Sequence, residues 1–316
     1  MPNGNGLNNL YIPYQAGDNG TRPLPSGANF WSGPGVTLDP TNGAVDQSTY
    51  IPNNQPCGIL VQVQNKSQVA YQLITVEVWV CNPATLVGPE SGLPIASGSS
   101  TTSMTGQVLN PSGMQFIVPV AGFQPYPGLT KSPGDHVCLI ANCYGTTADN
   151  QTDGQSLIGS TTANFVSLVQ TDGHVAQHNI FAQQTQGGQN KLSFGFNAAT
   201  AQDQGHEDVT LEILHQPAAT GLTAGDLAFL HNGPFKHLPL HPGTHSVKDY
   251  LIHGCHGGPT KRGTVRIHAK HPVPLQLEIE LDHHETKGAV QSFDVIQKGA
   301  NGQVQGGIRL LAVVAH

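Results

Sequence analysis

The feature that most constrains the fold is a long series of short, strand-like segments separated by turn signals. Residues 57–64 read CGILVQVQ, in which apolar residues alternate with glutamine. Residues 275–281 alternate leucine or isoleucine with glutamine and glutamate. This period of two is typical of half-buried strands, and no window of about eleven residues has a convincing helical period. Short strands at this spacing predict an all-β sandwich or barrel with very little helix.

The segments fall into two sets, which suits a chain of 316 residues and predicts two consecutive immunoglobulin-like antiparallel β-sandwiches. The first set is 35–38, 57–64, 73–81, 114–120, 136–144 and 175–182; the second is 191–196, 209–215, 246–252, 263–269, 275–281, 289–296 and 304–314. Pro119 places the segment 114–120 at a sheet edge. The predicted division is an extended leader at 1–28, a first sandwich at 29–182, a linker at 183–189 and a second sandwich at 190–316.

Few side chains are charged, since Asp, Glu, Lys and Arg make up 10% of the chain, against about 25% in an average protein. The net charge is −7 and there is no basic stripe, which speaks against nucleic acid as a partner. No apolar run approaches the ~18 residues of a membrane span, and the N-terminus does not resemble a signal peptide. A surface of neutral polar groups favours subunit contacts, because it lacks mutual repulsion. A stable secreted β-protein would have the same composition.

The leader is rich in Gly, Asn and Pro, and composition alone predicts that it is disordered. It contains only a few apolar anchors: Leu7, Leu10, Tyr11, Ile12 and Tyr14. Such a segment seldom orders by itself, and strand addition to a neighbouring copy would supply the missing contacts. We therefore take these five residues as candidate assembly contacts. The alternative is that the leader lies over its own first domain.

Several segments resemble bacterial tandem immunoglobulin-like modules of the CARDB type. They are FWSGPGVTL (30–38), VQVQNKSQVAYQLITVEVWVCNPAT (61–85), GDHVCLIANCYG (134–145), HVAQHNI (174–180) and GQVQGGIRLLAVVA (302–315). The resemblance implies adhesive, spacer or assembly domains and carries over no active-site residues. The acidic residue that usually follows the Pro is Gly35 here, which argues against a cation site at that position.

The cysteines are five in number: Cys57, Cys81, Cys138, Cys143 and Cys255. The odd count leaves at least one thiol free or paired between chains. Cys138 and Cys143 lie on one predicted strand, and their odd spacing puts the side chains on opposite faces. One inter-sheet disulfide is expected, if any, between Cys57 or Cys81 and Cys138 or Cys143. The favoured interpretation is that these cysteines are small buried hydrophobic residues.

Histidine is the sharpest chemical feature, because twelve of the 16 histidines fall between His206 and His284. The groups are His237, His241 and His245; His253, Cys255 and His256; His268 and His271; and Asp282, His283, His284 and Glu285. Imidazole, thiolate and carboxylate are ligands that Zn²⁺ or Cu²⁺ prefers. The sequence predicts one transition-metal site at His253, Cys255 and His256, completed by His283 or His284. No Cys-X2-Cys pair or His-Glu-X2-His motif supports a conventional zinc site.

Two other interpretations of the histidines remain open. In a chain poor in Lys and Arg, histidine can serve as a polar surface residue or as a subunit contact. Several imidazoles in a subunit contact would titrate near pH 6 and weaken that contact on acidification.

Catalytic motifs are missing from the sequence: there is no Gly-X-Ser-X-Gly elbow, Walker loop or dinucleotide fingerprint. The loop GGPTKRG at 257–263 lacks the Gly-Lys-Ser/Thr order, so it is interpreted as a turn. We therefore expect a non-enzymatic structural protein that self-assembles into a homo-oligomer or filament through its leader and edge strands, in an extracellular or particle-like assembly. The alternative is a module that binds metal through its His-rich half, or carbohydrate through Trp31, Tyr126 and Tyr144.

Overall fold

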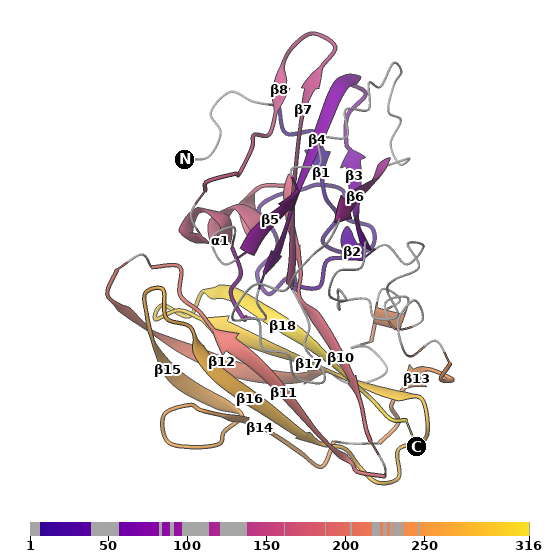
Figure 1. Cartoon of the computed structure of the whole chain (residues 1–316), viewed down its shortest axis with the longest axis vertical. Helices are drawn as coiled ribbons and strands as arrows, with labels where there is room; N and C mark the ends of the chain where they lie inside the picture. The colour runs from indigo at the N-terminus through magenta and orange to yellow at the C-terminus, as the bar shows by residue number, and fades with distance from the viewer. Residues whose placement is uncertain are drawn as a thin grey trace.

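The computed structural model describes residues 7–38, 57–81, 84–88, 92–96, 114–120, 138–160, 162–186, 188–202, 204–216, 222–223, 226–227, 230, 235, 237–245 and 247–315. In these ranges the chain is nearly all β, with one short helix, α1 (Thr162–Thr171), and a few helical residues at 226, 227 and 230. The strands form four sheets in two groups (Figure 1), which confirms the predicted fold class. No helix in the described residues is long and apolar enough to span a membrane.

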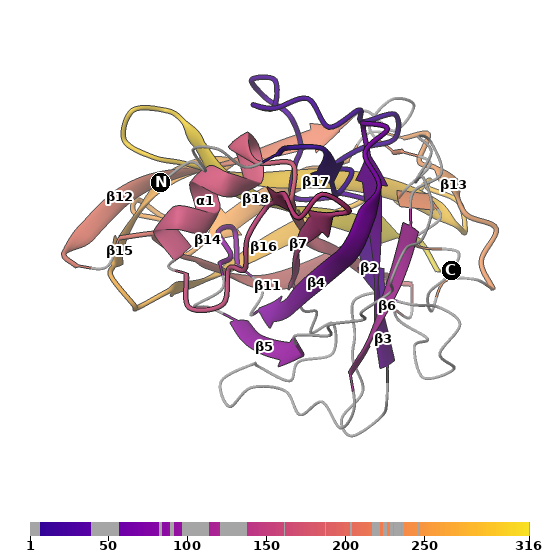
Figure 2. The same cartoon turned by 90° about the horizontal axis from the view of Figure 1, so that it is seen from above.

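The first group, from the N-terminal half, contains two sheets. One has the order β5 (Gly92–Ala96), β4 (Tyr71–Cys81), β7 (Cys138–Thr147), β8 (Thr152–Asp153), with β9 (Val175–His178) also paired to β7. The other has the order β1 (Leu10–Tyr11), β3 (Cys57–Asn65), β2 (Val36–Leu38), with β6 (Met114–Val120) paired to β3. Seen from above, β3 and β6 lie beside β4 (Figure 2). Among the described residues β6 pairs with β3 alone, so its predicted edge position, based on Pro119, is confirmed.

The second group, from the C-terminal half, is a sandwich with a densely packed core. Its larger sheet has the order β10 (Ile180–Gln184), β18 (Val304–Val313), β17 (Ala289–Lys298), β12 (His206–Gln216), β15 (Arg262–His268), with β13 (His241–Pro242) paired to β17. Its smaller sheet has the order β11 (Lys191–Ala198), β16 (Val273–Glu280), β14 (Asp249–His253). In β16 the predicted alternation is confirmed, because Leu275, Leu277 and Ile279 are buried between the sheets.

Strands β17 and β18 are buried along nearly their whole length, which means that both faces of the larger sheet are covered there. One face packs on the smaller sheet through residues such as Phe293 and Leu310. On the other face, Ile296 packs with the aromatic core of the first group. Farther along that face, Val290 and Leu311 pack against apolar residues of the segment 230–238. The two groups therefore share a packed boundary.

The chain passes from the first group to the second at Asn179, between β9 and β10. The sequence predicts one strand at 175–182 and a linker at 183–189. Instead, β10 pairs in parallel with β18, and Gln183 and Gln184 lie opposite Ala312 and Val313. The predicted linker thus begins inside a strand of the second sandwich, because the backbone of residues 180–184 is hydrogen-bonded to the C-terminal strand.

The leader folds onto its own chain, as the alternative interpretation states. Leu10 and Tyr11 form β1, which pairs with Asn65 and Gln64 of β3. Leu10, Tyr11 and Ile12 are 1%, 3% and 0% exposed, so they cannot reach another subunit in this fold. Leu7 and Tyr14 are partly buried, and the amide of Leu7 donates a hydrogen bond to the Thr152 carbonyl. The hypothesis that these residues are assembly contacts is therefore corrected for Leu10, Tyr11 and Ile12, and it stays a prediction for Leu7 and Tyr14.

Candidate functional site

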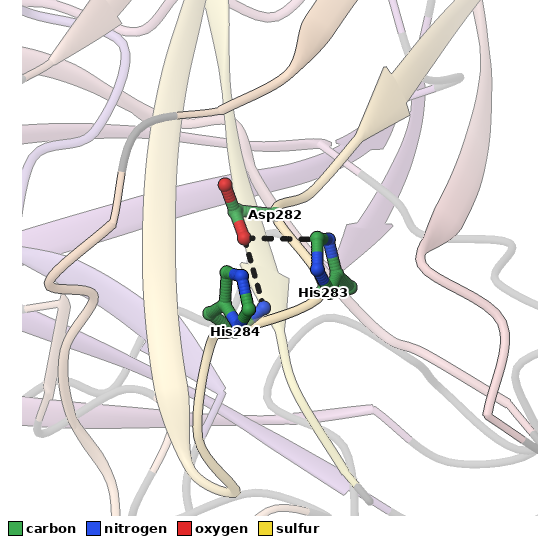
Figure 3. Close-up of side chains that lie close together, drawn as sticks. All are labelled: Asp282, His283 and His284. Atoms are coloured by element: carbon green, nitrogen blue, oxygen red, sulfur yellow. Dashed lines mark hydrogen bonds and ion pairs between the residues drawn. The ribbon is translucent and has the colours of Figure 1, made fainter.

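The tight turn between β16 and β17 brings ligand-type side chains together at Asp282, His283 and His284 (Figure 3). One potential ligand atom from each residue lies within 4.8 Å of the other two. Oδ1 of Asp282 accepts the amide N–H of His284 at 2.8 Å and lies 3.7 Å from Nδ1 of His283. Both imidazoles are exposed, and the carboxylate is partly buried.

A third imidazole borders this turn from a different segment. The ring centroid of His245 lies 5.9 Å from that of His284, and the rings of His283 and His284 are 3.8 Å apart. The hydrogen bond from the His284 amide, with the nearby imidazoles of His283, His284 and His245, holds the pKa of Asp282 below its usual value. An ionised carboxylate is thus surrounded by three imidazoles.

The two segments that carry these histidines are held together by Glu285, which is 6% exposed. Its carboxylate accepts the amide N–H of His245 at 3.1 Å and that of Thr244 at 3.2 Å. It also accepts Nε2 of Gln291 at 2.5 Å, and Oε1 of Gln291 lies 2.9 Å from Nε2 of His215. Gly243 allows the close approach, because a Cβ there would lie 2.6 Å from Oε1 of Glu285.

The remaining predicted ligands lie elsewhere. His253 of β14 lies opposite Gln276 of β16. Gln276 precedes Asp282 by six residues, which corresponds to roughly 20 Å along an extended strand. Nε2 of His253 lies 3.1 Å from a carboxylate oxygen of Glu278. Cys255 belongs to the sandwich core, where burial raises the pKa of its thiol, and His256 is exposed. The structure therefore brings His283 and His284 together with His245 and not with His253, Cys255 and His256.

Two of the cysteines considered for a disulfide are direct neighbours, since Cys81 of β4 lies opposite Cys138 of β7. Their sulfur atoms donate hydrogen bonds, Cys138 to Oδ1 of Asn179 at 2.6 Å and Cys81 to the Gly88 carbonyl at 3.7 Å. Cys143 is buried, and the alternation of β7 puts it on the other face from Cys138. Burial raises the pKa of both Cys138 and Cys143. The Cys57 side chain lies outside the described residues.

A buried charge cluster that was not predicted fixes the leader to the first group. Nε2 of His174 lies 2.8 Å from Oδ1 of Asp153, and Nδ1 lies 2.5 Å from Oδ1 of Asp172. Asp153 also accepts the Tyr71 hydroxyl and the amide of Leu10. Burial alone would lower the pKa of His174, but its hydrogen bonds to the two carboxylates raise it to about 9. The imidazolium and the Asp153 carboxylate are buried and Asp172 is partly buried, so this His–Asp arrangement serves structure.

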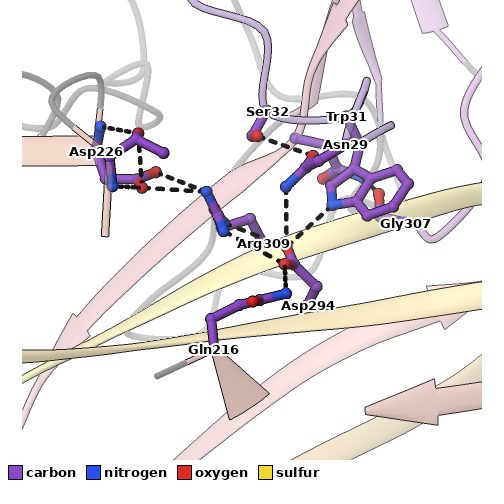
Figure 4. A network of polar contacts seen from close by, with 10 residues as sticks. Asn29, Trp31, Ser32, Gln216, Asp226, Asp294, Gly307 and Arg309 are labelled. Atoms are coloured by element: carbon purple, nitrogen blue, oxygen red, sulfur yellow. Dashed lines mark hydrogen bonds and ion pairs between the residues drawn. The ribbon is translucent and has the colours of Figure 1, made fainter. Parts of the chain in front are cut away.

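A second buried network joins the two groups of sheets (Figure 4). The guanidinium of Arg309 donates to both carboxylate oxygens of Asp294, at 3.2 and 3.3 Å, and to Asp226 at 3.1 Å. Asp294 further accepts Nε1 of Trp31 at 3.1 Å, Nδ2 of Asn29 at 3.3 Å and Nε2 of Gln216 at 3.1 Å. The network therefore links β17, β18 and Asp226 to the segment that precedes β2.

The aromatic residues considered for carbohydrate binding are not gathered at the surface. Trp31 is 2% exposed, and its ring lies over the backbone of β18, where a Cβ on Gly307 would be 2.7 Å from it. Tyr144 is half-buried in β7, and Tyr126 lies outside the described residues. The expectation of an exposed Trp31 is corrected, because its indole fills the boundary between the two groups.

No protein family and no curated protein sequence matches the chain. Among solved structures, the N-terminal domain of PorA has a TM-score of 0.25 at 10% identity, over 43% of this chain and 87% of that chain. The CupB6 tip adhesin from Pseudomonas aeruginosa has a TM-score of 0.23 at 10% identity, over 89% and 98% of the two chains. CfaE, the adhesive subunit of CFA/I fimbria of enterotoxigenic Escherichia coli, has a TM-score of 0.23 at 12% identity, over 99% and 94%. Similarity at this level identifies no family.

Proposed function

We propose that this chain is a non-enzymatic structural subunit, in which two β-sandwiches fixed to each other form one building block of an extracellular or particle-like assembly. The observation that supports this most strongly is the buried Arg309–Asp294–Trp31 network. A module that acts as a passive spacer or subunit needs a fixed geometry, and a buried charged network with several partners has only one good arrangement.

The contacts of Asn179, where the chain passes from the first group of sheets to the second, support the same proposal. Asn179 donates through Nδ2 to the carbonyls of Ala84 and Gly307, each at 2.7 Å, and its amide donates to the Trp31 carbonyl at 2.6 Å. The amide groups of Asn179 are thus hydrogen-bonded to residues of both groups of sheets. Rotation of one sandwich against the other would leave buried donors and acceptors without partners, which costs about 1–3 kcal/mol for each group.

Contacts between copies are proposed at the outer edge of β11. Among the described residues β11 is the end strand of the smaller sheet, with β16 on one side. On its other side, only the residue Asn197 near its C-terminal end is bridged, to Ala84. On its exposed face Ser193 and Gly195 are uncharged, and Lys191 at the start of the strand is paired with Glu280 of β16. An open edge whose middle is uncharged is suited to strand addition by a neighbouring copy.

Other edges of the second sandwich are less suitable. Strand β14 is covered by its own loop, because Ile252 and Thr260 exchange two backbone hydrogen bonds of 2.8 and 3.0 Å. The edge strand β15 carries Arg262, Arg266 and His268 on its exposed side. Charged side chains at an edge oppose strand pairing, so β11 is the edge that we assign to the contact.

Sedimentation and electron microscopy of the purified chain test the assembly. We expect oligomers, fibres or shells that disappear in the Ser193→Lys, Gly195→Lys double variant, because the added charges block the β11 edge. Gly195 accepts a side chain, since a Cβ there meets nothing within 4 Å. Thr264→Lys, which adds charge to the exposed face of β15, is the control and should assemble normally. A monomer at every concentration, or assembly unchanged by the double variant, would overturn the proposed contact.

A further inference from the structure

We infer that the turn Asp282–His283–His284, together with His245, binds one divalent transition-metal ion of the Zn²⁺ class. This site differs from the one that the sequence suggests, since it lacks His253, Cys255 and His256. It is also independent of the β11 edge and of the proposed structural role. The chemical class follows from the donors, which are three imidazoles and one carboxylate.

The donor geometry requires only side-chain rotation. Zn²⁺ binds imidazole nitrogen at about 2.0–2.1 Å in a tetrahedral arrangement, which puts donor atoms roughly 3.4 Å apart. The candidate atoms of Asp282, His283 and His284 already lie within 4.8 Å of one another. Both imidazoles are exposed and can change rotamer without moving the backbone. The His245 ring borders that of His284 and approaches from a separate segment, so it can close the coordination sphere.

The backbone that carries the donors is fixed before any ion arrives. Glu285 accepts the amides of Thr244 and His245, which holds the His245 segment against the turn. Asp282 accepts the amide of His284, which orients the carboxylate. Supporting residues of this kind position metal ligands and contribute to affinity.

The surrounding charge is compatible with a cation. Lys248, which precedes the neighbouring strand β14, forms an ion pair with Glu280, and Glu280 also pairs with Lys191. Lys287, in the same turn, is exposed to solvent. The carboxylates of Asp282 and Glu285 supply two negative charges at the turn itself.

A second pair of histidines provides a matched comparison within the same sandwich. His206 and His268 lie opposite each other on β12 and β15, with ring centroids 5.8 Å apart. They stand beside the exposed ion pair between Asp208 and Arg266, which already occupies the local carboxylate. This pair offers two imidazoles without a free carboxylate, so it should bind metal much more weakly.

Calorimetric titration of tag-free, chelator-treated chain with Zn²⁺ tests the site, and Co²⁺ absorption reports the coordination geometry. We expect one equivalent bound tetrahedrally. His283→Ala with His284→Ala should weaken binding by at least about 100-fold, which exceeds the 10–100-fold effect of losing a supporting residue. Glu285→Gln should weaken it by about 10-fold or more through that supporting role. Circular dichroism checks that each variant is folded.

His206→Ala with His268→Ala is the control and should leave Zn²⁺ affinity unchanged. Binding below one equivalent in the unaltered chain, or binding that survives His283→Ala with His284→Ala, would overturn the assignment. Binding that depends instead on His253, Cys255 and His256 would also overturn it. None of these results depends on whether the chain assembles, so the metal site and the structural proposal can fail separately.

Discussion

The indole Nε1 of Trp31 donates a hydrogen bond of 3.1 Å to Oδ1 of Asp294, and this contact joins the segment before β2 to the middle of β17. Asp294 is 2% exposed and also neutralises Arg309. One carboxylate therefore serves as an acceptor for both halves of the chain. Substitutions at this carboxylate and its donors therefore test the boundary between the two groups of sheets.

Removing either partner of this contact should destabilise the chain to different degrees. Trp31→Phe keeps most of the ring but loses the donor, which should lower the free energy of unfolding by about 2 kcal/mol. Asp294→Ala leaves Arg309 with Asp226 as its remaining carboxylate partner, also removes the acceptor of Trp31, and should cost about 3–5 kcal/mol. Urea unfolding followed by circular dichroism measures both. Asp208, which forms an exposed ion pair with Arg266, provides the control. Asp208→Ala should cost less than about 1 kcal/mol. Equal effects of Asp294→Ala and Asp208→Ala would contradict this account.

Gly306, at the boundary between the two groups of sheets, should reject even a methyl group. A Cβ on Gly306 would lie 2.1 Å from the Thr85 carbonyl oxygen, so Gly306→Ala must push the two sandwiches apart. Overpacking of this kind costs about 1–3 kcal/mol. The matched variant is Gly195→Ala, where a Cβ meets nothing within 4 Å. Thermal unfolding should show a lower Tm for Gly306→Ala than for Gly195→Ala, and the reverse order would refute the close approach.

The leader should behave as part of the first core. Ile12 is fully buried, so Ile12→Ala should destabilise the chain by about 2–5 kcal/mol. Leu7 is only partly buried, and Leu7→Ala should cost clearly less. If the leader were an arm that reaches another subunit, Ile12→Ala would change sedimentation and leave the unfolding of the dilute chain unaltered.

His174 should make the chain less stable at alkaline pH. Its pKa in the folded chain is about 9, above the unperturbed value of about 6.5. The stabilisation is therefore complete below about pH 6.5 and is lost as the pH rises through 9, up to about 3 kcal/mol at ~1.4 kcal/mol per pKa unit. Urea unfolding from pH 6 to 10 should show this loss in the unaltered chain. The His174→Gln variant should show a flatter profile.

His178 should have the opposite effect. Burial lowers its pKa to about 4, although its hydrogen bond to the Gly33 carbonyl raises it in part. A folded-state pKa below the unfolded one gives stability that is present above about pH 6.5 and is lost as the pH falls towards 4. Comparing the unaltered chain with His178→Asn between pH 7 and 4 isolates this loss. An acid profile that is the same in both chains would show that His178 is not buried in its neutral form.

Local periodicity predicted most of the longer strands, because a period of two needs no partner to be recognised, but it missed the short strands β1, β5, β8 and β13. It also placed Cys138 and Cys143 on opposite faces. It did not reveal α1, since Phe165 and Val169 repeat in only a ten-residue stretch. It placed the linker too late, because β10 is defined by its distant partner β18 and not by its own composition.

The candidate site was predicted only in part for a related reason. His283 and His284 stand out in the sequence, but their neighbour His245 is brought there by Glu285, 40 residues away in the chain. The charge networks were missed because their members are far apart, as with Arg309 and Asp226 at 83 residues. The composition of the leader predicts disorder, whereas Asp153, 143 residues from Leu10, supplies the acceptor that orders it.

The parallel pairing of β10 with β18 has a mechanical consequence. The first sandwich is attached at the Ile180 end of β10, while the C-terminal segment leaves from the Val313 end of β18, beside Gln184. Tension between the first sandwich and the C-terminus would therefore pull the two strands past each other along their length. All hydrogen bonds of the ladder would carry that load together instead of opening one at a time, so the ladder would resist a pull along this axis.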